Sequence, residues 1–347
     1  MNYSTAIRDI WKHRDLGRAR SDFEPLVHYA TLAASSHNTQ PWIFELGARE
    51  IKVRPDLSRR CPEVDPDDHH LFVSLGCAVE NLAQAARAAG LQAHTHYDSA
   101  ADCIKVDLER ISAASSDLFL AIPERRCTRA RFEKKGLTPG QWVELERVAR
   151  GFGVDVHIIT ARQEIERIVE FVAAGNDAQF SSAPWAREMR HWLRFNDRDA
   201  LRTGDGLYGR LFGIPSIPAW LGRAMMPVVA TAERQNERDA EQIRSSAGIL
   251  VFSSARDERS YQVEVGRCYE RFALRAASLG LQTAFINQPV EVPALRKEFA
   301  EEMALGARRL DLVVRIGYGP AVPHSLRRPL QDVIARGTEE VRWKRSA

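Results

Sequence analysis

A weak internal repeat is the feature of this sequence that most constrains its fold. Residues 75–92 (LGCAVENLAQAARAAGLQ) align with residues 265–282 (VGRCYERFALRAASLGLQ), and both segments end in Gly-Leu-Gln. Identical residues stand at four further offsets: Gly76 and Gly266, Glu80 and Glu270, Ala83 and Ala273, Ala86 and Ala276. Apolar residues recur every three or four positions, which predicts a buried helix, and the final glycine suits a left-handed C-cap. The repeat predicts two similar halves around central helices, although two alanine-rich helices can also match by chance.

Strand-like segments accompany both predicted helices. Short apolar runs predict strands at residues 42–46, 51–54, 103–108, 154–160, 248–253 and 310–317, and further helices are expected at 23–34, 138–151 and 162–174. This alternation predicts an α+β fold duplicated within one chain. The expected parts are an N-terminal arm (1–22), a first half (23–122), a second half (123–335) with an aromatic, lid-like insertion (181–230), and a charged tail (336–347). The insertion could equally be a structural cap over the core.

Composition excludes several classes of protein. The 347 residues include 49 basic and 46 acidic side chains, so the chain has no strongly basic face for nucleic acid. Five scattered cysteines without a C-x-x-C pair argue against a disulfide framework or zinc ribbon and favour a reducing cytoplasm. The longest apolar stretch, 214–230, contains three prolines and Arg223, too interrupted for the roughly 20 apolar residues of a membrane span. We expect a cytoplasmic protein that acts on a small molecule and binds neither nucleic acid nor a membrane.

The densest polar cluster is ASSHNTQPW, residues 34–42, between a predicted helix and a predicted strand. Ser35, Ser36, Asn38 and Gln40 place many hydrogen-bonding groups on one turn, and Pro41 fixes the start of the strand. Such a turn can bind a flat heteroaromatic ligand without bringing charge to it. The same residues can also form an elaborate structural turn.

Two basic clusters are candidate phosphate sites. The first is RRCTRAR, residues 125–131, and the second is Arg327-Arg328 after the last predicted strand. Arginines bind phosphate through paired hydrogen bonds, and a solvated basic loop is the alternative interpretation.

Other polar clusters carry weaker signals. His69-His70 follows three aspartates, and His94 and His96 share a strand face, but neither pair has a third ligand at typical metal-site spacing. We expect both pairs to lie on a solvated surface and no metal to be bound. No G-x-G-x-x-G follows a strand, so a Rossmann-type nucleotide site is not expected.

The turn and the arginine cluster together resemble motifs of the nitroreductase superfamily. ASSHNTQPW is similar to that family's flavin-contacting turn, with Ala34 in place of proline, and RRCTR is similar to its R-R-S-x-R phosphate motif, with Cys127 in place of serine. The helix 75–92 and the closing segment DLVVRIGYGPAVPHSLRRPLQDVI also resemble family segments. Because the turn precedes the arginine motif and each occurs once, the order resembles the Acg-type subgroup, in which two nitroreductase-like halves are fused as an intramolecular pseudo-dimer.

The resemblance implies one FMN per chain, held between the halves. Arg125 and Arg126, with Arg327 or Arg328, would bind the phosphate, and Arg129 would face the N1–O2 edge of the flavin. The remaining residues implied at the cofactor are Thr128 from the arginine motif and Ser35, Ser36, Asn38, Gln40 and Pro41 from the turn.

The implied function is that of an FMN-dependent oxidoreductase. Hydride would pass between flavin N5 and a small conjugated acceptor such as a nitro compound or quinone, with NAD(P)H as a candidate electron donor. The alternative is an FMN-sequestering or storage protein whose flavin is covered by the insertion 181–230. The resemblance implies a monomer with an internal pseudo-dimer, or a homodimer.

Overall fold

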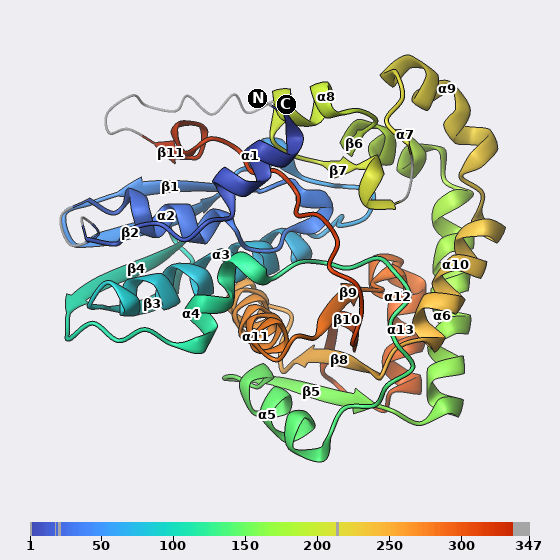
Figure 1. The fold of residues 1–347 in the computed structure, drawn as a ribbon. Coiled ribbons are helices and arrows are strands. Elements are labelled where there is room, and N and C mark those ends of the chain that lie inside the picture. Colours follow the sequence, from blue (N-terminus) through green and yellow to red (C-terminus); the bar gives the residue numbers. More distant parts are fainter. Residues whose placement is uncertain (1, 18, 20–21, 213–214, 336–347) are drawn as a thin grey trace.

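The computed structural model describes residues 2–17, 19, 22–212 and 215–335, without the side chains of 227–229. The predicted tail 336–347 lies outside the described residues. Two mainly antiparallel sheets lie on either side of a central pair of helices, and further helices and loops flank one side (Figure 1). The predicted α+β class is therefore confirmed.

The first sheet has the strand order β11-β1-β2-β4-β3. Its strands are β1 (Trp42–Leu46), β2 (Glu50–Pro55), β3 (Leu91–Asp98), β4 (Cys103–Arg110) and β11 (Ile334–Ala335). All neighbours are antiparallel except β11, which pairs in parallel with β1 through Phe44 and Ile334. The end of the described chain therefore returns to the sheet at its beginning.

The second sheet repeats this arrangement. Its order is β5-β8-β10-β9, formed by β5 (Val154–Ile159), β8 (Gly248–Ser254), β9 (Gln282–Phe285) and β10 (Arg309–Gly317). In both sheets the first four strands lie in the spatial order first, second, fourth, third, and the central helix runs between the second and the third. All four strands of the second sheet are antiparallel to their neighbours, as the equivalent four are in the first.

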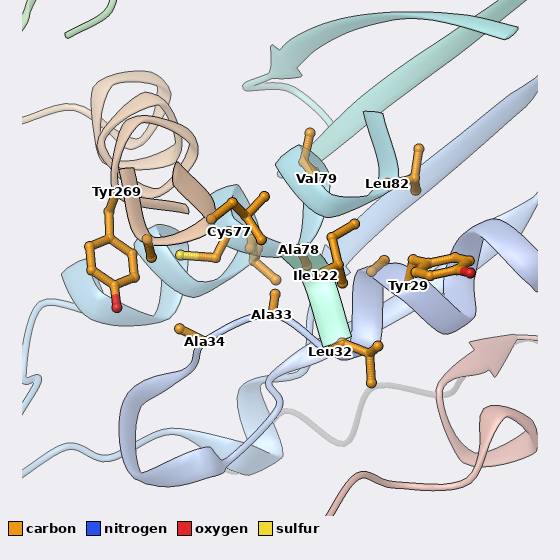
Figure 2. Packing of buried hydrophobic residues seen from close by; sticks show 14 of the residues in the cluster. Tyr29, Leu32, Ala33, Ala34, Cys77, Ala78, Val79, Leu82, Ile122 and Tyr269 are labelled. Atoms are coloured by element: carbon orange, nitrogen blue, oxygen red, sulfur yellow. The ribbon is translucent and has the colours of Figure 1, made fainter. Parts of the chain in front are cut away.

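The two central helices, α3 (His69–Ala88) and α11 (Arg259–Ser278), pack directly on each other. A Cβ added to Gly76 would meet the carbonyl oxygen of Val263 at 2.0 Å, and one added to Gly266 would meet that of Val73 at 1.9 Å. These glycines let the two backbones touch, which explains why the repeat has glycine at this offset. Figure 2 shows the same core at Cys77 and Ala78, which lie beside Ala33 and Ala34 from the first half.

Other helices surround this core. The predicted helices form α2 (Glu24–Thr31), α5 (Pro139–Ala149) and α6 (Arg162–Phe180), and α5 begins with a capping box between Thr138 and Gln141. Helices that were not predicted are α1 (Tyr3–Ile10), α4 (Asp117–Ala121), α10 (Ala232–Arg244), α12 (Gln288–Glu291) and α13 (Pro293–Glu302). Within the part of the chain that the structure describes, none of the helices has the length and apolar character needed to cross a membrane.

Residues 181–230 form α7 (Ala183–Trp192), β6 (Leu193–Arg194), α8 (Asp197–Thr203), β7 (Leu207–Tyr208) and α9 (Ala219–Val229). This segment packs on the first half: Trp185 and Trp192 bury against Cys61 and Val64, and Asp205 pairs with Arg59. Most of its aromatic side chains are therefore buried rather than exposed, with Trp220 the exception among those described.

Candidate functional site

A cavity of about 520 Å³ lies where the segment 181–230 meets the helices and strands of the core. This volume falls in the range of roughly 300–1,000 Å³ typical of small-molecule sites. One wall is almost entirely apolar and comes mainly from the segment 181–230: Phe180, Trp185, Met189, Leu193, Leu207, Phe212 and Met226. A flat conjugated ligand can lie against this wall, because aromatic and methionine side chains adapt to such surfaces.

Another part of the lining is polar. It is formed by the predicted turn, by α3, and by the facing ends of α6, α10 and α12: Ser35, Ser36, His37, His70, Asn176, Gln179, Asp239, Gln288 and Glu291. The Asp239 carboxylate accepts hydrogen bonds from Asn176, Gln235 and Gln288 at 2.9–3.1 Å. Burial raises the pKa of both Asp239 and Glu291. The low-dielectric surroundings therefore favour the neutral forms of these acids.

The turn at residues 34–42 is held in a strained shape. His37, Asn38 and Gln40 have positive φ angles of 49°, 54° and 54°, a region that non-glycine residues rarely adopt. The hydroxyl of Ser35 accepts a hydrogen bond from the backbone N–H of Gln40 at 3.1 Å, and the N–H of Ser36 donates to Ser74. The strain is maintained by these contacts, and it turns Ser35, Ser36 and His37 toward the cavity.

Asn38 and Gln40, both implied at the cofactor by the resemblance, anchor the turn. Asn38 donates to the carbonyls of Gly206 and Leu326, both at 3.2 Å. Gln40 donates to the carbonyl of Gly204 at 2.8 Å and accepts from the backbone N–H of Arg328 at 2.8 Å. Neither side chain lines the cavity, and Pro41 is buried next to them. These side chains therefore tie the turn to the segment 181–230 and to the closing segment.

Arg125 and Arg327 lie together behind Ala34, outside the cavity wall. The Arg125 guanidinium pairs with Glu270, Nε to Oε1 at 2.9 Å, and donates to the carbonyl of Leu32. Arg327 donates to the carbonyls of Thr31, Leu32 and Ala33 and to the side chain of Asn38. Two cations at the last carbonyls of α2 stabilise its C-terminus. The structure thus brings these predicted residues together, but all five guanidinium N–H groups of Arg327 point at protein acceptors.

Burial shapes the charge of this group. Burial lowers the pKa of Arg327 to about 9 and raises the pKa of the Glu270 carboxyl. The Ala34 N–H also hydrogen-bonds Glu270. The two arginines and Glu270 therefore form one buried ionic cluster directly behind the cavity wall.

Arg126 and Thr128 of the arginine motif, and Arg328 of the second basic cluster, also bind acceptors within the protein. Arg126 donates to the carbonyl of Val322 at 2.8 Å, and Arg328 donates to the carbonyl of Gln40 at 3.1 Å. Thr128 is fully buried and donates to Gln282 at 2.6 Å. None of the three lines the cavity.

Arg129 is the one residue of the motif on the cavity wall. Its guanidinium lies 4.7 Å from the centre of the Phe212 ring, a cation–π contact. Among the described residues it has no carboxylate partner. A cation on the cavity wall suits a ligand edge that carries negative charge; Asp239 and Glu291 of the same lining also interact with it electrostatically.

Sequence reasoning missed Arg315, which lies on β10 and also lines the cavity. It is 1% exposed, it donates to the carbonyls of Thr128 and Ala130, and burial lowers its pKa to about 10. The sequence does contain a signal for this residue, an arginine inside the apolar run LDLVVRIG. Burying an arginine there is energetically unfavourable unless its N–H groups find hydrogen-bond acceptors.

The expectation of a solvated surface at His69-His70 was wrong, because both side chains are buried at the start of α3. The N–H groups of His70 and Leu71 donate to the carboxylate of Asp65 at 2.9 Å, so the aspartate serves to cap the helix. His69 lies against Asp311, with Nε2 3.4 Å from Oδ1. His94 and His96 are exposed, as predicted. Among the described residues there is no group of three or more potential metal ligands.

Comparisons with known proteins place this geometry in context. No family model matches the chain. Two curated proteins, from two strains of Mycobacterium tuberculosis, are each 26% identical over 333 residues, covering 91% of this chain and 91% of theirs. Both carry the name NAD(P)H nitroreductase as a provisional assignment. The likeness supports the nitroreductase superfamily.

Solved nitroreductases resemble the chain more distantly. A Desulfitobacterium hafniense nitroreductase with bound FMN is 12% identical, covering 64% of this chain and 99% of its own, with a TM-score of 0.40. An FMN-dependent nitroreductase of Mycobacterium smegmatis in complex with NADPH is 11% identical, covering 64% of this chain and 98% of its own, with a TM-score of 0.40. The support for the nitroreductase superfamily comes from the curated relatives, which match over 91% of this chain.

Proposed function

We propose that the chain is an FMN-dependent oxidoreductase of the nitroreductase type, using NAD(P)H and reducing a small conjugated acceptor such as a nitro compound or a quinone. The observation that carries this proposal is the cavity, whose lining includes Ser35 and Ser36 of the predicted turn together with Arg129. The names of the full-length relatives support the same cofactor chemistry.

The residues at the cavity fit the ring of FMN. Ser35 and Ser36 offer neutral hydrogen-bonding groups, and the guanidinium of Arg129 would face the edge that becomes negative on reduction. When bound, FMN supplies the hydride-transfer chemistry, while the protein orients the ring and tunes its charge. Burial raises the pKa of Asp239 and Glu291, which weakens their negative charge, while Arg129 and Arg315 bring positive charge to the same lining.

The phosphate would be held by Arg125 and Arg327. Each guanidinium group donates to the carbonyl of Leu32, two residues before Ala34 of the cavity lining. Binding a phosphate would exchange these neutral acceptors for a charged one, which forms stronger hydrogen bonds with arginine. Arg126 and Arg328, the sequence neighbours of these two arginines, are further candidates to bind the phosphate.

We infer further that the chain consists of two fused nitroreductase-like halves of the Acg type, with one flavin site. The equal strand orders and the reciprocal glycine contacts support this inference. Glu270 pairs with Arg125, whereas its counterpart Glu80 pairs with Arg267 and Arg271. Arg271 also donates to the carbonyls of Val148 and Arg150 at the end of α5, much as Arg327 does at the end of α2. The second, symmetry-related position would thus be filled by α11 itself.

An anaerobic visible absorption spectrum of the purified protein, before and after adding NADPH or NADH, tests the proposal. A flavin spectrum that bleaches on addition of nicotinamide is the expected result. A flavin that bleaches only with dithionite would instead favour sequestration, and a protein that neither contains nor takes up flavin would refute the proposal.

A further inference from the structure

The outer end of the segment 181–230 carries an exposed apolar surface. Trp220 and Met225 of α9 are 71% and 45% exposed, and Pro215 and Pro218 just before the helix are exposed as well. Figure 1 shows α9 at the outer edge of the molecule, away from both sheets. Exposed apolar side chains on a neighbouring stretch of chain can mark a contact with a partner or a membrane.

The same segment carries a surplus of unpaired positive charge. Residues 181–230 contain seven arginines, no lysine and four acidic residues. The acids are directed to internal partners: Glu188 accepts from the backbone N–H groups of Glu63 and Val64, and Asp205 pairs with Arg59 and Arg194. Four arginines have no hydrogen-bond or ion-pair partner within the described residues: Arg187, Arg190, Arg198 and Arg223.

We propose that α9 and these four arginines dock the protein on an anionic lipid bilayer. In an interfacial membrane contact, aromatic and aliphatic side chains enter the boundary between headgroups and acyl chains while basic side chains meet anionic headgroups. Trp220 and Met225 supply the first kind of side chain, and the arginines of α7, α8 and α9 supply the second. Figure 1 draws these helices along the upper edge of the molecule, with α8 beside α1 and with α7 and α9 further to the right.

A second copy of the chain fits this surface less well. A two-fold dimer uses the same patch on both subunits. Pairing through α9 would therefore bring the unpaired arginines of one copy against the same arginines of the other, and the repulsion would oppose association. An anionic bilayer neutralises them instead.

Docking would place the rim of the cavity at the lipid surface. Met226 of α9 and Ala230 just after it both line the cavity, so the helix that meets the bilayer is also part of the cavity wall. This inference does not depend on which cofactor the cavity holds.

Co-sedimentation with vesicles tests the proposal on the full-length protein. We expect the protein to sediment with vesicles of mixed phosphatidylglycerol and phosphatidylcholine but not with phosphatidylcholine alone. Binding should weaken with added salt, because the screening length falls from about 10 Å at 0.1 M to about 3 Å at 1 M. Absence of binding to the anionic vesicles would overturn the proposal.

Matched variants assign the binding to this surface. Trp220→Ser with Met225→Ser should weaken binding by about tenfold or more, and Arg187→Gln and Arg223→Gln by about fivefold each. Phe152→Ser is the control, because Phe152 is 82% exposed in the loop between α5 and β5 and should bind like the wild type. Equal binding by a folded Trp220→Ser, Met225→Ser protein, or loss of binding in the Phe152 control, would contradict the assignment. A concentration-dependent dimer in ultracentrifugation that these α9 substitutions abolish would assign the surface to a second copy instead.

Discussion

The carbonyl oxygen of Val263 lies 2.0 Å from the point that a Cβ on Gly76 would occupy. The two central helices therefore meet backbone to backbone, and the cavity beside them is built on a rigid base. Cys77, the next residue along α3, is buried and lines that cavity. Substitutions at the helix crossing should therefore also alter the shape of the cavity.

Gly76→Ala should destabilise the fold by at least about 1–3 kcal/mol, because the added methyl group overlaps a backbone atom that cannot move aside alone. Chemical denaturation followed by circular dichroism measures the change. Gly140→Ala on α5 is the matched control: nothing lies within 4 Å of its added Cβ, so the free energy of unfolding should be unchanged or slightly higher. Similar losses in both variants would show that the close crossing is not the cause.

Arg125→Ala should remove bound flavin and also lower the free energy of unfolding by about 3–5 kcal/mol, because it leaves Glu270 buried without a partner. Flavin content per folded chain and the denaturation midpoint are measured together. Adding Glu270→Gln to Arg125→Ala should restore much of the stability but not the flavin. A folded Arg125→Ala, Arg126→Ala protein with normal flavin content would exclude the phosphate role.

Arg129→Gln should make the bound flavin harder to reduce, because the cation that favours the negatively charged reduced form is lost. The reduction potential of the bound flavin, measured against a reference dye, should become more negative. Arg131→Gln serves as the control, since Arg131 is a surface residue paired with Glu241. An unchanged potential in Arg129→Gln would place the flavin edge elsewhere.

Purified holoprotein should contain one flavin per polypeptide, because Arg267 and Arg271 occupy the position equivalent to the Arg125 cluster. Flavin absorbance after denaturation, divided by protein concentration from amino-acid analysis, gives the ratio. A value near two would contradict the inference of a single site.

Asp311 should make the fold less stable as pH rises. Burial raises the pKa of its carboxyl to about 8 from an ordinary value of 3.8, so the folded state holds a proton that the unfolded state releases. Its stabilising contribution is therefore complete below about pH 3.8 and is lost as pH rises toward 8. Asp311→Asn should flatten this decline in urea midpoints between pH 5 and 8.

The contribution of Asp67 to stability should depend on pH in the opposite direction. Burial opposes its ionisation, but Arg309 and Arg296 hold the pKa of its carboxyl at about 2. Its contribution is therefore present above about pH 4 and is lost only as pH falls toward 2. Asp67→Asn should lower stability by a similar amount at every pH from 5 to 8, and a parallel pH slope in Asp311→Asn and wild type would refute the assignment to Asp311.

Local patterns in the sequence predicted the elements that depend on them. The apolar runs of β1, β8 and β10 and the spaced alanines of α3 were recognised because burial of one face dictates those residues. The four-residue β9 and the highly polar α10 were missed, since neither has a long apolar period and both are stabilised by tertiary contacts.

The sequence predicted several residues of the site but not how each side chain is used. Ser35, Ser36 and Arg129 line the cavity, but Asn38 and Gln40 serve the turn itself. Sequence cannot distinguish these uses, because an amide binds a carbonyl of its own chain as readily as a ligand. The buried His69 was misjudged for a related reason: its burial is set by β10, more than 200 residues away.

The parallel pairing of β11 with β1 joins Phe44 to Ile334, residues that are 290 positions apart. Arg327 and Arg328, just before β11, are among the residues that hold the strained turn in place. During synthesis, residues 34–42 leave the ribosome long before Arg327 and Arg328 are added. The turn therefore cannot yet make its contacts with these arginines. The cavity can take its final shape only after almost the whole chain has left the ribosome. A chain released early would lack the contacts that give the cavity this shape.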